Sequence, residues 1–270
     1  MPVAHYENFP VASLLLPAPL RQPVSIIYRF ARSADDFADE GELTVPARLA
    51  LLEGYRSELD RLKAGTPPLA PLFQELGRVI TAHRLPFAPF YDLLDAFSQD
   101  VTQLRYASFA EVMAYCRRSA DPVGRLMLCL FRRSDDGSVA CSDAICSALQ
   151  LINFWQDVEI DFLKNRVYLP QDEMERFGVS EAQIAARDVS GGWWNLMRFQ
   201  IERARALLLS GAPLAVRLPG RIGLETRAVV QGGLRILEKL ERVMGDVFRH
   251  RPVLKTLDWP LILCRALLGR

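Results

Sequence analysis

The 270-residue sequence has few histidines and few cysteines, and its charges almost cancel. Its three histidines (His5, His83 and His250) are scattered, and its five cysteines form no C-x-x-C pair, so no zinc or iron site of these residue types is indicated. A formal net charge of +1 provides no basic surface for a nucleic-acid partner. Cysteines within apolar segments are typical of reduced thiols in a cytoplasmic protein.

Long apolar runs are also missing. No run approaches the roughly 18 apolar residues that a membrane span needs. The first residues, MPVAHYENFP, lack the basic region and apolar core of a signal peptide. We therefore expect a cytoplasmic protein that at most lies at the inner face of the membrane.

Apolar residues recur at three- and four-residue spacing, whereas the alternating pattern of β-strands is missing. The breaks between these segments are short, and no long Gly/Ser/Pro linker or repeat is present. The sequence therefore predicts one all-α domain over residues 1–270. Its helices are expected at 22–40, 46–64, 69–84, 88–104, 108–131, 138–163, 191–211 and 221–248.

The C-terminal stretch 252–268 has two interpretations. Its apolar side chains could pack on the helical domain, which we favour, or lie in a membrane interface as a short amphipathic segment. The residues concerned are Trp259, Leu261, Ile262, Leu263, Leu267 and Leu268.

Acidic residues are concentrated in the stretch RSADDFADE (32–40), directly after an apolar segment. Asp35 and Asp39 lie one helical turn apart, and Arg32 lies one turn before them on the same face. A solvated helix end would explain a cluster of this kind if it stood alone.

A second acidic pair occurs in QLINFWQDVEIDF, within the segment 138–163, which is apolar nearly all round in its first half. Gln150, Asn153, Asp157 and Asp161 fall on one helical stripe. A polar stripe on such a helix faces water, a partner or a cavity, because unpaired buried amides and carboxylates are costly. Gln and Asn in place of Lys or Glu favour a cavity over solvent.

Two Asp-x₃-Asp pairs that faced each other would repel strongly unless cations lay between them. Mg²⁺ suits this arrangement because it takes oxygen ligands and typically binds one or two carboxylates together with substrate phosphates. The pattern therefore indicates a Mg²⁺-bridged diphosphate in an apolar helical cavity.

The sequence resembles the head-to-head trans-isoprenoid (squalene/phytoene) synthases. YRFARSADDFAD is similar to their first aspartate-rich motif, QLINFWQDVEID followed by KNRVYLPQDE to their second, and YCRRSADPVG to a segment between them. The resemblance spans about residues 5–245. It implies an isoprenoid-synthase fold, a multi-helix bundle around a central apolar cavity. There, Mg²⁺ ions, about two or three in number, would help a prenyl diphosphate to ionise.

The resemblance also implies residue roles. The catalytic set would be Tyr115 beside the reacting carbons together with the metal-binding carboxylates. The metal ligands would be Asp35, Asp39, Asp157, Asp161 and Asn153. The diphosphate-binding set would be Arg32, Gln150, Asn153, Arg166 and, as a weaker candidate, Tyr168. Two simpler alternatives stay open: Arg166 as a helix cap and Tyr115 as a core tyrosine.

Departures from the family pattern narrow the expected substrate. The segment at 5–10, HYENFP, has Glu7 where two-substrate members commonly carry a serine-rich diphosphate site, and Gln231-Gly232-Gly233 stands where many show Arg-x-Tyr. HYENFPVAS, SADPVG and GGLRILEK resemble the bacterial hydroxysqualene synthase subfamily of hopanoid biosynthesis. These features predict conversion of presqualene diphosphate and water to hydroxysqualene and diphosphate without NADPH.

Other functions stay open. One is head-to-head condensation of two prenyl diphosphates, as in squalene, dehydrosqualene or phytoene synthases. Another is an inactive helical scaffold of a prenyl-lipid pathway. The expected partners are the prenyl diphosphate and the pathway enzymes upstream and downstream, with peripheral membrane contact as a further option and no nucleic acid.

Overall fold

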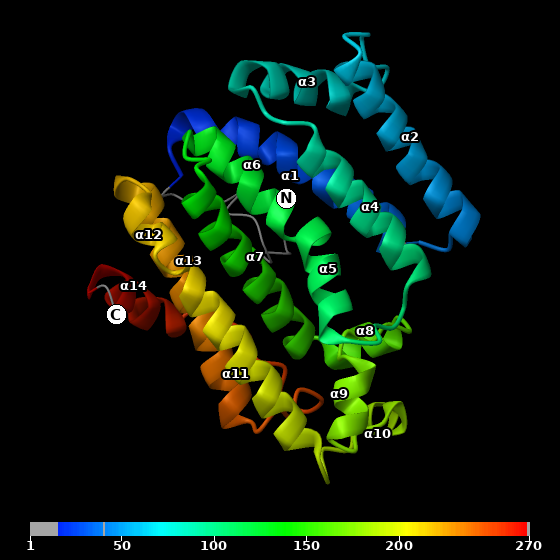
Figure 1. Ribbon diagram of the computed structural model, residues 1–270, viewed down its shortest axis with the longest axis vertical. Helices are drawn as coiled ribbons and strands as arrows, with labels where there is room; N and C mark the ends of the chain where they lie inside the picture. The colour runs from blue at the N-terminus through cyan, green and yellow to red at the C-terminus, as the bar shows by residue number, and fades with distance from the viewer. Residues whose placement is uncertain (1–15, 40, 269–270) are drawn as a thin grey trace. The chain divides into compact units, whose positions relative to one another are not determined.

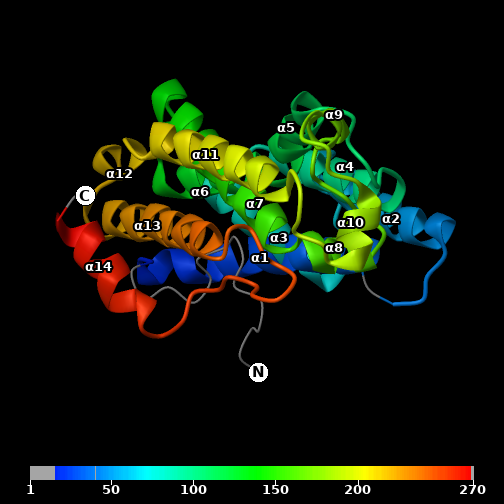
Figure 2. The same cartoon turned by 90° about the horizontal axis from the view of Figure 1, so that it is seen from below.

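A computed structural model describes residues 16–39 and 41–268 (Figures 1 and 2). Within these residues the regular structure is helical, which confirms the predicted all-α class, and the only β-type pairing is an isolated bridge between Arg105 and Val167. No described helix is long and apolar enough to cross a membrane. The helices are α1 (Ala18–Asp39), α2 (Val45–Lys63), α3 (Pro71–His83), α4 (Ala88–Thr102), α5 (Phe109–Ser119), α6 (Asp121–Phe131), α7 (Asp136–Gln156), α8 (Val158–Leu163), α9 (Gln171–Arg176), α10 (Glu181–Ala186), α11 (Trp193–Gly211), α12 (Leu214–Arg217), α13 (Gly220–Arg242) and α14 (Asp258–Leu268).

The chain divides into two compact units. Unit 1 comprises the chain up to Gln103 together with Arg117–Val139, and unit 2 comprises Leu104–Cys116 together with the chain from Ala140. The single domain expected over 1–270 stays a prediction.

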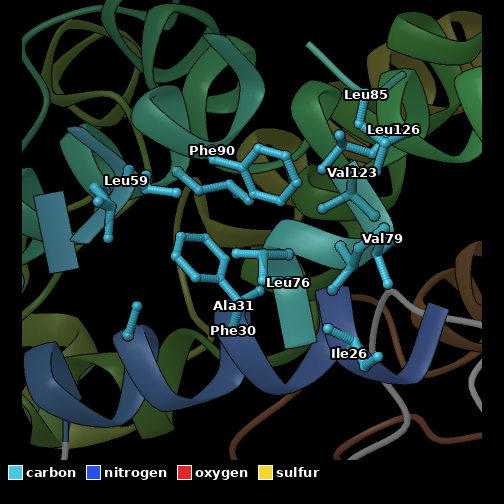
Figure 3. Packing of buried hydrophobic residues seen from close by; sticks show 14 of the residues in the cluster. Ile26, Phe30, Ala31, Leu59, Leu76, Val79, Leu85, Phe90, Val123 and Leu126 are labelled. Atoms are coloured by element: carbon cyan, nitrogen blue, oxygen red, sulfur yellow. The ribbon is translucent and has the colours of Figure 1, made fainter. Parts of the chain in front are cut away.

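The core of unit 1 forms around Phe30 on α1. This fully buried ring lies 5.4 Å from the ring centroid of Phe90 on α4 and 5.8 Å from those of Phe73 on α3 and Tyr55 on α2. Figure 3 shows side chains of the same buried cluster from several helices, including Leu126 of α6. The buried residues of α1 recur every three or four positions, so its acidic residues are left on the opposite side.

Unit 2 contains α11, α13 and α14, which pack successively against one another (Figure 1). Gly211 at the end of α11 permits close contact with α7, because a Cβ atom there would lie 2.5 Å from the carbonyl oxygen of Cys141. Trp193 on α11 is fully buried and donates a hydrogen bond from its indole nitrogen to the Gly245 carbonyl at 2.9 Å.

Several predicted helix boundaries were wrong. The segment 108–131 is interrupted at Ala120, and 138–163 is interrupted at Asp157. The last predicted helix ends at Arg242 instead of 248, because Met244 and Gly245 adopt positive φ angles. The short helices α9, α10 and α12 were not predicted, since four to six residues are too few to establish a helical period.

Candidate active site

The first acidic cluster lies at the C-terminal end of α1, in unit 1. Arg32 contacts the carboxylates of Asp35 at 3.1 Å and Asp36 at 2.7 Å, all three side chains being about one-third exposed. This confirms that Arg32 and Asp35 share a face. It also shows that Asp36, which the sequence left without a role, contacts the same guanidinium.

This position is electrostatically unfavourable for so many carboxylates. The C-terminal end of a helix carries partial negative charge, and α1 has no basic residue in its last turn. Arg48 holds the last turn of α1 and the chain that follows it, because it donates hydrogen bonds to the carbonyl oxygens of Phe37 at 2.8 Å and Gly41 at 2.7 Å. A bound cation would relieve the repulsion, and carboxylate oxygens suit Mg²⁺.

The second acidic cluster lies in unit 2, at the junction of α7 and α8. Asp157 is 7% exposed and accepts a hydrogen bond from Nδ2 of Asn153 at 3.0 Å, so these two residues share a face as predicted. The backbone N–H of Asp157 still bonds to Asn153, and that of Asp161 bonds to Asp157, so the polar stripe continues across the break. Gln150 and Asp161 are partly exposed on it.

Arg251 contacts the second acidic cluster, and the sequence did not reveal this contact. It donates two hydrogen bonds to the Asp157 carboxylate, at 2.5 and 3.0 Å, from the segment that follows α13. Gln156 holds the same segment through a 2.6 Å bond to the Pro252 carbonyl. No local motif signals a pairing between residues so far apart in the chain. The pair brings a guanidinium, a group that suits phosphate oxygens, next to the second cluster.

A tight turn after α8 positions Arg166 and Tyr168. Asn165 adopts a left-handed conformation with φ of 60°, which asparagine tolerates better than most residues. The chain then returns so that Arg166, Val167 and Tyr168 line a small pocket with Asp161 and Phe154. Two diphosphate-binding candidates and one carboxylate of the second motif are thus brought together.

Arg105 clamps this turn. Its guanidinium donates to the Asn165 carbonyl at 2.5 Å and to Oδ1 of Asn165 at 3.1 Å, and it pairs with both oxygens of Glu181 at 2.6 and 2.8 Å. The hydrogen bonds from Arg105 hold the pKa of Glu181 below its ordinary value despite partial burial. Arg105 is therefore a positioning residue for Arg166 and Tyr168.

We expect Arg105→Ala to loosen the turn, because both of its hydrogen bonds to Asn165 are removed at once. Hydrogen exchange of the Val167 amide, which bonds to the Leu104 carbonyl at 3.0 Å, should accelerate about tenfold. Arg187→Ala is the matched control, since Arg187 is 63% exposed and pairs with Glu159 on α8 without touching the turn. Equal exchange rates in the two variants would contradict the assigned clamp.

Tyr115 lies in an aromatic cluster of unit 2. It is 4% exposed, and its ring centroid lies 5.7 Å from those of Tyr106 and Tyr168 and 6.0 Å from that of Phe154. Phe154 and Tyr168 stack at 3.8 Å with an interplanar angle of 6°. Both residues of this stack line the pocket beside Asp161. Aromatic faces next to a carboxylate can stabilise a positive charge on a hydrocarbon.

The predicted metal ligands carry oxygen donors only, from four carboxylates and one carboxamide, and these suit Mg²⁺. Within residues 16–39 and 41–268, no group of three or more His, Cys, Asp or Glu side chains is gathered as a metal-binding cluster. That both acidic clusters bind the same ions stays a prediction.

Two segments of the sequence depart from the family pattern, and the structure describes one of them. The segment 5–10 lies outside the described residues. Gln231, Gly232 and Gly233 lie within α13, where a Cβ atom on Gly233 would approach a side-chain atom of Leu208 to 2.8 Å. A larger residue at 233 would therefore require the Leu208 side chain to shift, whereas a Cβ atom on Gly232 would make only an ordinary contact with Leu254 at 3.6 Å.

A family model described as squalene/phytoene synthase matches residues 3–258. The chain belongs to this family. Its members process prenyl diphosphates, so the chain belongs to a family of enzymes.

Individual relatives agree with this assignment. A hydroxysqualene synthase of Rhodopseudomonas palustris is 36% identical over 94% of this chain and 85% of its own length. The crystal structure of squalene synthase HpnC from Alicyclobacillus acidocaldarius superimposes with a TM-score of 0.82 and 37% identity, over 89% of this chain and 90% of that one. A phytoene synthase of Mycobacterium tuberculosis is 32% identical over 73% of this chain and 65% of its own length.

Proposed function

We propose that this chain converts presqualene diphosphate and water to hydroxysqualene and diphosphate. The observation that carries the proposal is its similarity to the hydroxysqualene synthase of Rhodopseudomonas palustris over nearly its whole length. In the reaction, the C–O bond to diphosphate breaks, the carbocation rearranges, and water forms a new C–O bond and releases a proton. No hydride enters the product, so NADPH is not required.

The residues proposed to act on the diphosphate come from both acidic clusters. Asp35 and Asp39 from α1, with Asn153, Asp157 and Asp161, would hold Mg²⁺, which supplies positive charge to the departing diphosphate. Arg32, Gln150 and Arg166 would contact the diphosphate oxygens, and Arg251 adds a guanidinium beside Asp157.

The aromatic cluster would enclose the hydrocarbon next to the diphosphate. Tyr115, Phe154 and Tyr168 pack together and present ring faces rather than basic groups, so they would stabilise the carbocation without quenching it.

The five cysteines, all free thiols, fit a protein that works in the reducing cytoplasm.

The deciding assay gives the pure protein presqualene diphosphate and Mg²⁺ without NADPH and identifies the lipid by mass spectrometry. We expect hydroxysqualene and one equivalent of diphosphate, and we expect both to disappear with EDTA and to return with added Mg²⁺. Product formed only from farnesyl or geranylgeranyl diphosphate would instead identify a condensing enzyme, the alternative that the phytoene synthase relative supports. If the protein converts none of these diphosphates, the result would favour the alternative of an inactive helical scaffold.

A further inference from the structure

The outer face of α14 is apolar throughout. Asp258, Ile262 and Ala266 are buried at four-residue spacing and Arg265 is partly buried beside them, so these residues form the inner face of the helix. The exposed residues contain no charged or hydrogen-bonding side chain apart from one thiol and one indole. We name them the α14 outer face: Trp259, Pro260, Leu261, Leu263, Cys264, Leu267 and Leu268.

This arrangement overturns the favoured prediction that 252–268 packs its apolar residues on the helical domain. Of the six residues named for that role, Ile262 alone is buried, whereas Leu267 is 68% and Leu268 66% exposed. Leu257, just before the helix, is 90% exposed. An ordinary surface helix has the opposite polarity, with its apolar side inward and its charges in water.

Ion pairs with α13 hold the helix in this orientation. Asp258 pairs with Arg235 at 2.7 Å and with Lys239, and Arg265 pairs with Glu238 at 2.5 Å (Figure 2 shows α14 against α13). Because both charged residues of α14 are engaged on its inner side, the helix cannot turn to bury its leucines without breaking these pairs.

Most of the cations in this part of the chain are paired. Between Arg249 and Leu268, the three arginines Arg249, Arg251 and Arg265 pair with Asp246, Asp157 and Glu238, and the one acidic residue, Asp258, is buried. Lys255 is exposed directly before Leu257 and the helix. An apolar face that begins next to an exposed lysine is complementary to a bilayer that carries anionic headgroups. Trp259 also suits the boundary between headgroups and acyl chains.

A second copy of the chain suits this face less well. A helix of 11 residues is about 16 Å long. The exposed fractions of its outer residues leave this face below the roughly 800 Å² per partner of a stable interface. A bilayer needs no such area, because side chains that insert into it are surrounded by lipid on all sides.

We propose that α14 docks this protein on the surface of anionic phospholipid bilayers, with the α14 outer face inserted at the headgroup boundary. A bilayer is also where the C30 prenyl chains of substrate and product would dissolve, and this one argument rests on the proposed function. The binding itself can be measured without substrate, so it stands or fails separately from the enzyme assay.

The test is co-sedimentation of the full chain with vesicles of phosphatidylglycerol and phosphatidylcholine. We expect the wild type to bind these vesicles, to bind pure phosphatidylcholine more weakly, and to lose affinity as salt is raised. Changing three leucines of the outer face to glutamine should reduce binding at least about tenfold. The variant carries Leu263→Gln, Leu267→Gln and Leu268→Gln.

A matched control changes three leucines of comparable exposure in unit 1. It carries Leu43→Gln, Leu51→Gln and Leu69→Gln, at positions that are 45%, 39% and 73% exposed, against 43%, 68% and 66% in the α14 variant. This control should bind vesicles as the wild type does. Wild-type protein that sediments with neither vesicle, or an α14 variant that binds as well as the control, would overturn the proposal.

Cys264 provides a second measurement that needs no substitution, because its thiol is exposed on the outer face. A water-soluble maleimide should label Cys264 readily in buffer and about tenfold more slowly once vesicles are added, as peptide mass spectrometry can measure. Protection that is already complete in buffer would show that another segment or a second copy covers the face. Sedimentation velocity would tell these two apart, and either result would overturn the proposal.

Discussion

Asp157→Asn is expected to lower the turnover of presqualene diphosphate about a thousandfold while leaving the fold intact. The substitution removes one negative charge from the second acidic cluster and leaves the Arg251 guanidinium facing a neutral amide. Mg²⁺ should then bind more weakly, so the Mg²⁺ concentration for half-maximal activity should rise. The asparagine has almost the same shape as aspartate, and its oxygen can still accept a bond from Arg251.

Glu159→Gln is the matched control for this prediction. It removes the same charge two residues away on α8, where Glu159 pairs with the exposed Arg187 outside the polar stripe. We expect its activity to stay within about threefold of the wild type, because exposed ion pairs contribute little. If Asp157→Asn were as active as Glu159→Gln, Asp157 would have no role in the reaction.

The second large effect is expected in stability. Asp258→Asn should lower the free energy of unfolding by about 3 kcal/mol, because it leaves Arg235 and Lys239 without their shared carboxylate. Asp258 is 4% exposed, and it also accepts a 2.7 Å bond from the backbone N–H of Lys255. Urea unfolding would measure the change, with Asp246→Asn as the control, since the partner of Asp246, Arg249, is 67% exposed.

The same carboxylate predicts a pH dependence. Burial alone would raise the pKa of Asp258, but the hydrogen bonds from Lys239, Lys255 and Arg235 hold it far below its ordinary value of 3.8. A group with a lowered pKa stabilises the folded protein above its unfolded pKa, and this contribution is lost as the pH falls below that value. The stability difference between wild type and Asp258→Asn should therefore be constant near pH 7 and shrink below about pH 4. A difference that stayed constant into acid would contradict the assigned ion pairs.

Local patterns in the sequence predicted much of the fold and part of the site. The long helices follow directly from apolar residues at three- and four-residue spacing, since this spacing decides which face of a helix can be buried. The pairing of Arg32 with Asp35 and of Asn153 with Asp157 was likewise predictable, because neighbours on one helical face are fixed by the helix itself. The break in the helix at Asp157 was not predictable, since the residues around it continue the helical pattern.

The sequence by itself thus determined the helical class and the family, because both depend on order along the chain, and on the same basis it predicts which residues carry oxygen ligands. Tertiary structure alone decided which distant residues join them. Arg251 reaches Asp157, and Arg105 clamps the turn at Asn165, through contacts across many residues that no local period encodes. Tertiary structure also decided which face of α14 is exposed. The composition of 252–268 permitted packing or exposure, and ion pairs to α13 turned its charges inward and its leucines outward.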